Sequence, residues 1–371
     1  MQINVDKTKV MIFNKTGRFF RRSFYFGDTN LFSTNSYKYL GFIVTPSGEI
    51  LSGMNDLKDR SLRAYFKLKK AMGNYFRLYP KVTIHLFDTL IKPILLYNSD
   101  FWGCLKPPSN NPIENTHMRF CKDLLGVQRQ TTNIGVLLEL WRVPIMLYGK
   151  KNCIKNWARI AIQGKANYLV LLSYLNSTEN QLKWPELVKE CLVRMGIGEE
   201  NESNVIGIRA MQRMADIFHQ EAFTDINREG SKLRTYAKLK RQRGIENYLN
   251  TITNVENRIY LSKIRLSNHD LMIEKGRHLR LEAYQRNCPL CPLTVVEDES
   301  HFLLECQTFS FLRDEMFFHS KYLSPGFENL YREQQLKYLL SDEKMMIHTG
   351  TYLQKGLKLR RFLLNKHKNA L

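Results

Sequence analysis

Three cysteines and one histidine within nineteen residues constrain the fold of this chain more than any other feature of its sequence. The set is Cys288, Cys291, His301 and Cys306, with the spacing Cys-x2-Cys-x9-His-x4-Cys. A Cys-x2-Cys turn presents two sulfurs to one ion, and three thiolates with one imidazole form a closed tetrahedral set that suits structural zinc. The spacing therefore predicts one structural Zn²⁺ with no open position for catalysis. Unrelated side chains or a disulfide are the alternatives, and His278 is a weaker rival ligand.

The residues around His301 predict how the cluster is built. Asp298 or Ser300 is placed to cap a short helix that carries His301. Five residues separate His301 from Cys306, about 140° around an α-helix, so Cys306 is expected just past the end of that helix. Glu297, Asp298 and Glu299 are expected to be helix N-terminal acids, which the helix dipole favours.

The charge of the chain indicates a polyanionic partner. Its 371 residues are enough for two or three domains, and 43% of them are hydrophobic, so wholesale disorder is excluded. Lys and Arg number 56 against 35 Asp and Glu, a formal net charge of +21. Such a balance favours a polyanion as a partner, and a basic surface that only maintains solubility is the alternative.

Cysteine usage and hydropathy predict where the protein works. The other cysteines, Cys104, Cys121, Cys153 and Cys191, are scattered and do not resemble a disulfide framework, so a reducing compartment is expected. The N-terminal residues contain no apolar signal-peptide core, and no apolar run approaches about eighteen residues. The sequence thus predicts an intracellular protein, nuclear or cytoplasmic, which is neither secreted nor a membrane protein.

Periodicity predicts an α+β chain that is mostly α-helical. Short strands are expected at 10–13, 23–26 and 37–44, and a helical period begins at Met54. Helix starts are expected at Asn111-Pro112, Thr132, Pro144, Ser324-Pro325 and Ser341-Asp342, with a helix end at Gly126. These signals predict strands over 1–50, a helical bundle over 51–195, a polar linker at 196–204 and a basic C-terminal domain over 205–371.

One basic stretch is a candidate phosphate-binding surface. Its cations include Lys232, Arg234, Lys240, Arg241 and Arg243. Lys232, Tyr236 and Lys240 would share one helical face, so phosphate neutralisation is favoured over a merely solvated face. Arg277 and Arg280 are further candidates, and Arg265, His269, Arg277 and His278 could form a backbone-binding strip before the cysteine cluster.

Six segments, in order, resemble the C-terminal part of reverse transcriptases from LINE-type (non-LTR) retrotransposons. They are residues 4–13 (NVDKTKVMIF), 37–43 (YKYLGFI), 86–97 with the Phe-Trp-Gly of 101–103, 119–127, 139–144, and 266–278, which the cysteine cluster follows. The resemblance implies a palm remnant with a primer-grip-like hairpin, a helical thumb with its extension, and a zinc-containing C-terminal region. It also implies nucleic-acid contacts by Lys7 and Lys9, although lysines of an ordinary edge strand are the alternative. Tyr39 and Gly41 match the turn that positions the primer end, and a structural role is the alternative there.

The sequence departs from that family at the catalytic centre. Two-metal phosphoryl transfer needs clustered carboxylates, and this chain contains no Asp-Asp pair. The resemblance and this departure together imply a fragment of a reverse transcriptase that binds RNA or single-stranded DNA, largely independently of sequence, without polymerase activity of its own. A truncated gene model of an active RNA-directed DNA polymerase and a zinc-stapled scaffold for protein interactions are the alternatives.

Overall fold

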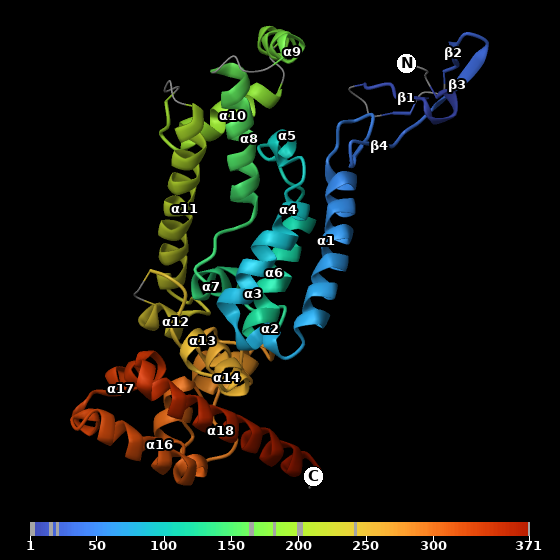
Figure 1. Cartoon of the computed structure of the whole chain (residues 1–371). Helices are drawn as coiled ribbons and strands as arrows, with labels where there is room; N and C mark the ends of the chain where they lie inside the picture. The colour runs from blue at the N-terminus through green and yellow to red at the C-terminus, as the bar shows by residue number, and fades with distance from the viewer. Residues whose placement is uncertain are drawn as a thin grey trace. The chain divides into compact units, whose positions relative to one another are not determined.

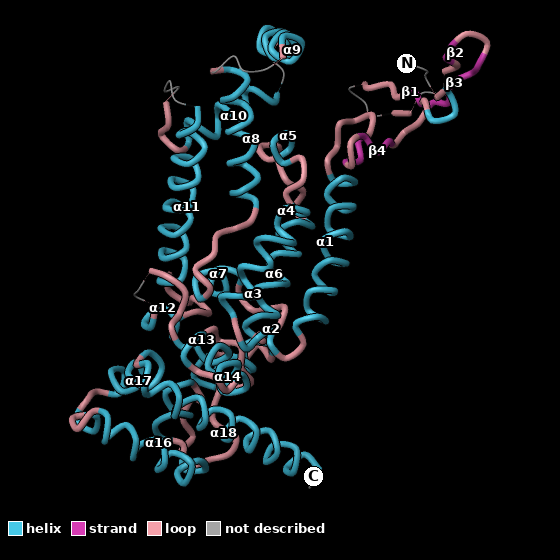
Figure 2. Tube along the Cα trace, viewed as in Figure 1, coloured by secondary structure: helices cyan, strands magenta, loops and turns pink. Residues whose placement is uncertain are grey.

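The protein is mostly helical, with a few short strands near its N-terminus (Figures 1 and 2). A computed structural model describes residues 4–14, 18–19, 22–162, 167–180, 183–198, 203–240 and 243–369. The prediction of an α+β, mainly α-helical chain is confirmed. No helix among these residues has both the length and the apolar character that crossing a membrane requires.

Contacts within the chain group it into two compact units, each made of several segments. The first unit comprises Met1–Ala71, Ile84–His117 and Pro144–Asp216. The second unit comprises Met72–Thr83, Met118–Val143 and Ile217–Leu371. The domain boundaries expected from the sequence stay a prediction, and residues 199–202 of the expected linker lie outside the described part of the chain.

The strands belong to the first unit and form two small sheets. In one, β3 (Thr29–Ser33) pairs in parallel with β1 (Lys9–Val10) and antiparallel with β2 (Phe24–Phe26). In the other, β4 (Tyr37–Tyr39) and β5 (Phe42–Val44) form a hairpin. The strand expected over 37–44 is therefore divided in two, as the resemblance of residues 37–43 to a hairpin implies, because Leu40 and Gly41 both have positive φ, 44° and 83°, which turns the chain in two residues.

Most of the first unit is helical. Its helices are α1 (Leu51–Met72), the π-helical η2 (Phe87–Ile91), α4 (Lys92–Leu95), α5 (Ser99–Trp102), α8 (Met146–Ala161), α9 (Tyr168–Glu179) and α10 (Lys183–Arg194), with the short 3-10 turn η1 (Val5–Lys7). Helix α8 packs against α5, α9 and α10. Gly53 of α1 leaves room for the Phe42 ring, which a Cβ at that position would meet at 2.2 Å, so the hairpin sits directly on α1.

Besides α1, whose last residue Met72 belongs to the second unit, three helices contribute residues to both units: α3 (Pro80–Leu86), α6 (Pro112–Leu125) and α11 (Ser203–Asn227). The predicted start of α6 is confirmed, since Oδ1 of Asn111 accepts hydrogen bonds from the backbone N–H groups of Ile113 and Glu114 at 3.0 and 3.3 Å. Its predicted end is confirmed at Gly126, which has a φ of +70°.

The second unit holds the C-terminal helices around α18 (Figure 1). Its α-helices are α2 (Tyr75–Leu78), α7 (Asn133–Glu139), α12 (Arg234–Leu239), α13 (Tyr248–Thr251), α14 (Val255–Arg265), α15 (Met272–His278), α16 (Ser310–Leu323), α17 (Arg332–Ser341) and α18 (Glu343–Asn369). Its short turns are η3 (Ala283–Gln285), the π-helical η4 (His301–Glu305), η5 (Gln307–Phe309) and η6 (Phe327–Asn329). Helix α18 packs against α14, α16 and α17.

Two predicted helix starts near the C-terminus had different outcomes. Asp342 caps α18 as expected, because its Oδ1 accepts hydrogen bonds from the N–H groups of Lys344 and Met345 at 3.1 and 2.9 Å. The start expected at Ser324-Pro325 is wrong, since only the turn η6 follows it and the next helix begins at Arg332.

Candidate metal centre and basic residues

The four predicted ligands come together in the second unit. Cys288 follows Asn287, which pairs with Val296 in an isolated antiparallel bridge, so the chain folds back on itself around Cys291. His301 opens the turn η4, and its N–H donates to Oδ1 of Asp298 at 2.7 Å, as the sequence predicts. Cys306 lies immediately after η4, and its N–H donates to the carbonyl of His301 at 2.8 Å.

The ligand atoms of this cluster all lie within 4.8 Å of one another. The sulfurs of Cys288 and Cys306 are 3.9 Å apart, and the sulfur of Cys291 is 3.4 Å from Nε2 of His301. Cys288, His301 and Cys306 are buried, whereas Cys291 is half-buried. Four convergent side chains of these types could hold one metal ion.

The thiols share protons when no metal is bound. A hydrogen bond between the sulfurs of Cys288 and Cys306, in which either can be the donor, raises the pKa of Cys288 to about 12 together with burial. The same hydrogen bond lowers the pKa of Cys306. A cation that enters the cluster replaces these protons, because thiolate is the form that binds metal.

A buried ion pair borders the cluster. The guanidinium of Arg360, on α18, donates to both carboxylate oxygens of Glu297 at 2.6 Å, and both residues are almost fully buried. Oε1 of Glu297 lies 3.8 Å from the sulfur of Cys288, and Oε2 accepts a hydrogen bond from the N–H of Met272. The positive charge of Arg360 therefore offsets a carboxylate that lies beside a ligand sulfur.

Two further contacts hold the His301–Cys306 turn. The buried Arg313 donates to the carbonyls of Leu303 and Cys306 at 3.1 and 2.6 Å. The hydroxyl of Tyr352, on α18, donates to the carbonyl of Phe302 at 2.6 Å. The turn that carries two of the four ligands is thus fixed to α16 and α18 by side chains that satisfy its carbonyls.

Arg234, a candidate phosphate ligand, takes part in an ion-pair chain. Its guanidinium donates to Glu274 at 2.7 Å and to Glu299 at 2.9 Å. Glu299 also accepts from Nε2 of His269 at 2.9 Å. Burial opposes ionisation of Glu299, but His269 and Arg234 lower its pKa to about 2, so it stays charged. Arg277 lies 3.9 Å from Glu274, so the structure brings Arg234 and Arg277 to the same carboxylate.

Lys240 does not lie on an exposed basic face, and this corrects the predicted phosphate-binding cluster. Its side chain is buried, and Nζ donates to Glu246 at 2.6 Å and to the carbonyl of Gly244 at 2.8 Å. Tyr236, expected on the same exposed face, is also fully buried. Lys240 and Tyr236 point into the unit because Glu246 neutralises the ammonium of Lys240 and apolar side chains surround both residues. The local sequence does not reveal either contact.

The predicted strip before the cysteine cluster needs a similar correction. Arg265 is fully buried and forms a 2.8 Å ion pair with Glu139, which accepts a further 2.6 Å hydrogen bond from the hydroxyl of Tyr248. Arg265 also pairs with Glu246, so Lys240, Glu246, Arg265 and Glu139 form one buried ionic network. His269 is buried as well. Only Arg277 and His278 of that strip reach the surface.

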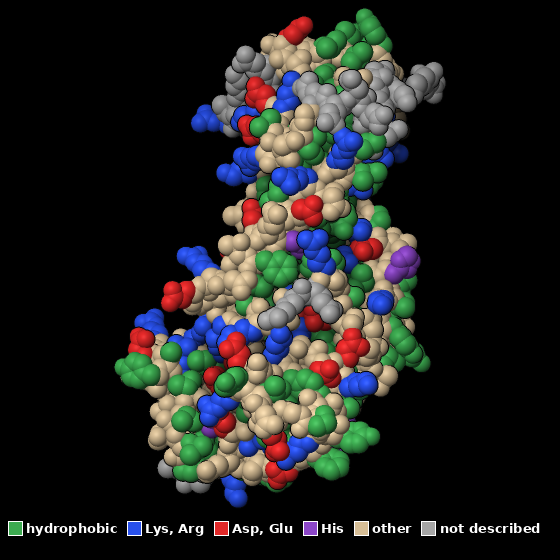
Figure 3. Space-filling model, turned by 90° about the vertical axis from the view of Figure 1, so that its left-hand side faces the viewer, with side chains coloured by type: hydrophobic (Ala, Val, Ile, Leu, Met, Phe, Trp, Pro, Cys, Tyr) green, Lys and Arg blue, Asp and Glu red, His purple; other side chains and the backbone are tan. Residues whose placement is uncertain are grey.

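Lys232, Arg243 and Arg280 remain available to a polyanion. Lys232 is half-buried, Arg243 and Arg280 are exposed, and none of them forms an ion pair with a residue that the structure describes. Arg241 lies outside the described residues. On the face drawn in Figure 3, Lys and Arg side chains are spread between Asp and Glu rather than gathered in one continuous stripe.

The N-terminal candidates lie in the first unit. Lys7 and Lys9 are exposed, and Tyr39 is 63% exposed at the tip of the β4–β5 hairpin. Gly41 has no side chain to offer a ligand. Its carbonyl accepts a hydrogen bond from the Arg60 guanidinium at 2.8 Å, and a Cβ at this position would lie 3.2 Å from the Tyr97 ring. Gly41 therefore has a structural role in the first unit, whereas the other three side chains reach solvent.

Sequence analysis missed the residues that surround the metal centre. Glu297 and Glu299 were expected at a helix N-terminus, but both are buried and ion-paired, and only Asp298 has the capping role. Arg360 lies 63 residues from Glu297 in the sequence, so no local pattern links the two. The one local indication in the sequence was that Glu297 and Glu299 lie on either side of Asp298, shortly before His301.

Comparison with known proteins identifies no relative of this chain. No family model matches the chain, and no curated protein or solved structure has significant similarity to it.

Proposed function

We propose that this chain is a zinc-stabilised nucleic-acid-binding fragment of the kind that forms the C-terminal part of LINE-type reverse transcriptases. The observation that carries the proposal is the convergence of Cys288, Cys291, His301 and Cys306 in a strongly basic chain. The order of the six segments that resemble this family supports the same assignment.

The distances in the cluster fit zinc. With Zn–S bonds of about 2.3 Å and a Zn–N bond of about 2.0 Å, a tetrahedron has sulfur–sulfur edges of about 3.8 Å and sulfur–nitrogen edges of about 3.6 Å. The Cys288–Cys306 separation is 3.9 Å and the Cys291–His301 separation is 3.4 Å. The three sulfurs and Nε2 would hold the ion, and with all four positions filled the zinc would stabilise the fold.

The environment of the cluster also suits zinc. Nδ1 of His301 lies 3.7 Å from Glu305, a carboxylate placed to orient the imidazole whose Nε2 faces the sulfurs. Three thiolates and one Zn²⁺ leave a net negative charge, which the buried Arg313 beside Cys306 favours. We assign the site a structural role on these grounds.

The binding role rests on basic side chains that form no ion pair with any residue in the described part of the chain. Lys232, Arg243 and Arg280 in the second unit, and Lys7 and Lys9 in the first, can approach phosphates. Arg277 shares its carboxylate with Arg234 and is partly exposed, so it can add a contact. Contacts of this kind neutralise backbone charge and carry little sequence information, so binding is proposed to be largely sequence-independent.

The proposed role is binding rather than polymerisation. Polymerase chemistry needs carboxylates that hold two magnesium ions, and the sequence contains no adjacent pair of aspartates. The palm-like hairpin and the thumb-like helices are assigned, within this proposal, to holding nucleic acid.

Fluorescence anisotropy with a labelled single-stranded RNA and a DNA of the same sequence tests the proposal. We expect binding to both, with affinity that falls steeply between about 50 and 200 mM salt and varies little when the sequence is scrambled. Absence of binding at the lower salt concentration by the zinc-loaded chain would overturn the nucleic-acid role and favour a scaffold for protein interactions.

A further inference from the structure

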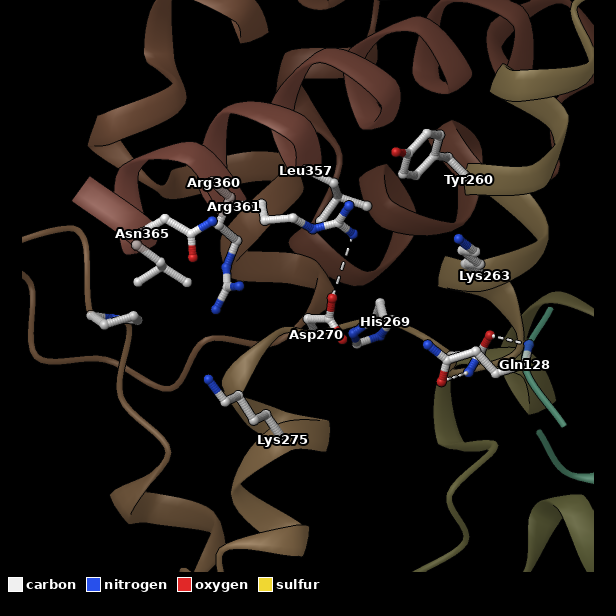
Figure 4. Close-up of a pocket in the computed structure, with 13 residues that line it drawn as sticks. Gln128, Tyr260, Lys263, His269, Asp270, Lys275, Leu357, Arg360, Arg361 and Asn365 are labelled. Carbon is white, nitrogen blue, oxygen red and sulfur yellow. Dashed lines mark hydrogen bonds and ion pairs between the residues drawn. The ribbon is translucent and has the colours of Figure 1, made fainter. Parts of the chain in front are cut away.

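A pocket of about 550 Å³ lies next to the metal centre, inside the second unit (Figure 4). Its wall is formed by α14, by the loop that leads into α15, by α15 itself and by the last part of α18. Pro289, between two of the metal ligands, also lines it. A pocket of this size matches those that take a ligand of the size of a nucleotide.

The pocket carries an excess of positive charge. Lys263, Lys275 and Arg361 line it from three different helices and lie around Asp270 (Figure 4). Asp270 is the single carboxylate in the lining, 3.7 Å from Arg361, in an exposed pair that contributes little. Three cations less one carboxylate leave two positive charges, and Arg360 adds none because Glu297 neutralises it.

The surroundings of Lys263 disfavour its positive charge, so a bound anion would stabilise it. Burial lowers the pKa of its ammonium group, and the charge of Arg361 lowers it further. Arg77 acts in the same direction, whereas Asp270 and Glu256 act against it. An anion in the pocket would offset this repulsion between Lys263 and Arg361.

The rest of the lining suits the uncharged part of a nucleotide. Leu357 and Leu364 of α18 provide apolar surface, and the Tyr260 ring lies 5.3 Å from the ammonium of Lys263. His269 is buried in the wall and donates from Nε2 to Glu299, while Nδ1 has no hydrogen-bond partner among the residues that the structure describes.

We propose that this pocket binds one phosphate-bearing nucleotide unit, with its phosphate between Lys263, Lys275 and Arg361 and its nucleoside against Tyr260 and Leu357. The unit can be a free nucleotide or one residue of a bound strand, and only the second source rests on the function proposed above.

Isothermal titration of the zinc-loaded full chain with a nucleoside 5′-monophosphate, with the matching nucleoside and with inorganic phosphate tests the site. We expect the monophosphate to bind best and the nucleoside to bind at least about tenfold more weakly, because the charge-assisted hydrogen bonds are lost. The Lys263→Ala/Arg361→Ala variant should lose about tenfold or more in affinity for the monophosphate. The Lys344→Ala/Lys355→Ala variant removes the same charge from α18 outside the pocket and should bind as the unchanged chain does.

The source of the phosphate is decided by competition. Displacement of the monophosphate by a single-stranded oligonucleotide, with weaker oligonucleotide binding by the pocket variant, assigns the site to a strand. Oligonucleotide binding that is unchanged in the pocket variant assigns it to a free nucleotide and leaves the nucleic-acid role intact. Monophosphate binding without any oligonucleotide binding would remove the nucleic-acid role and keep the pocket. Equal affinity for nucleoside and monophosphate, or a folded pocket variant with unchanged affinity, overturns the inference.

Discussion

Arg360 and Glu297 form a two-pronged ion pair, with both bonds at 2.6 Å, that ties the last helix to the loop carrying the metal ligands. Replacing Arg360 with Met leaves the Glu297 carboxylate unpaired beside the sulfur of Cys288. We expect the free energy of unfolding to fall by about 3–5 kcal/mol, as for other broken buried pairs. Urea unfolding of the zinc-loaded chain measures this change.

The double variant Arg360→Met/Glu297→Gln provides the control for that experiment. It removes both charges, so it should recover part of the lost stability. A double variant that is less stable than the unchanged protein by the sum of the losses in Arg360→Met and in Glu297→Gln alone would show that the two residues do not act as a pair.

One zinc ion per chain should be bound by three sulfurs and one nitrogen. Replacing Cys306 with Ser should destabilise the second unit, because metal-binding free energy contributes directly to folding in such sites. Metal analysis, X-ray absorption and thermal unfolding check these points. Cys191→Ser, outside the cluster, should keep the full zinc content, and oxygen-rich coordination in the unchanged protein would contradict the assignment.

Truncation of Lys240 should lower the stability of the protein much more than truncation of Arg243, although both belong to the same basic stretch. Lys240→Ala removes one of the two cations paired with Glu246, the other being Arg265, and should cost about 1–3 kcal/mol of stability. Arg243→Ala changes an exposed side chain and should stay within about 0.5 kcal/mol of the unchanged protein. Chemical unfolding of the two variants side by side decides whether Lys240 has the internal role.

The exposed cations should set the salt dependence of nucleic-acid binding. Replacing Lys232, Arg243 and Arg280 together with Ala should lower the slope of log affinity against log salt by about two for a single strand, if each contacts one phosphate. The matched control replaces Lys321, Lys344 and Lys355. An equal change of slope in both variants would mean that net charge, and not these three contacts, governs binding.

Cys191 should be the most readily alkylated of three neighbouring cysteines in the first unit. The interaction with the neighbouring Cys104 thiol, aided by the charges of Lys150 and Arg194, lowers the pKa of Cys191 to about 6 against the opposing effect of burial. A thiol with a lowered pKa is mostly thiolate at pH 7. Its reaction rate with iodoacetamide should therefore rise less than about twofold between pH 7 and 8.5, against more than about tenfold for an ordinary thiol.

Mass spectrometry of the alkylated peptides follows this rate residue by residue. The variant Lys150→Met removes one of the stabilising charges and should move the onset of alkylation to higher pH. Cys104 and Cys153 are buried and should react slowly throughout. A Cys191 rate that climbs with pH like that of a free thiol would contradict the hydrogen-bonded arrangement.

The sequence predicts the metal centre well because its information is local. Cys288 to Cys306 span one short segment, and the capping role of Asp298 follows from its position three residues before His301. Spacing along a short loop limits where side chains can point, so the ligand set can be predicted without knowledge of the rest of the fold.

The burial of Arg265 and Lys240 could not be predicted in this way. Arg265 meets Glu139 across 126 residues of sequence, and the Lys240–Glu246 pair is buried by elements that are distant in the chain. From composition alone, such cations would be expected at the surface. A cation that binds phosphate and a cation that pairs with a buried carboxylate cannot be told apart in the sequence. Only tertiary contacts distinguish them.

Arg360 and Arg361 are consecutive residues of α18 that serve different neighbours: the first holds the ligand loop through Glu297, and the second lines the pocket. A small rotation of this helix alters both environments together. Metal and anion would then be coupled ligands, and each would change the affinity of the other by the same factor, as thermodynamic reciprocity requires. Removing the metal with a chelator would then change the affinity for the anion, and saturation with the anion would change the affinity for the metal by the same factor.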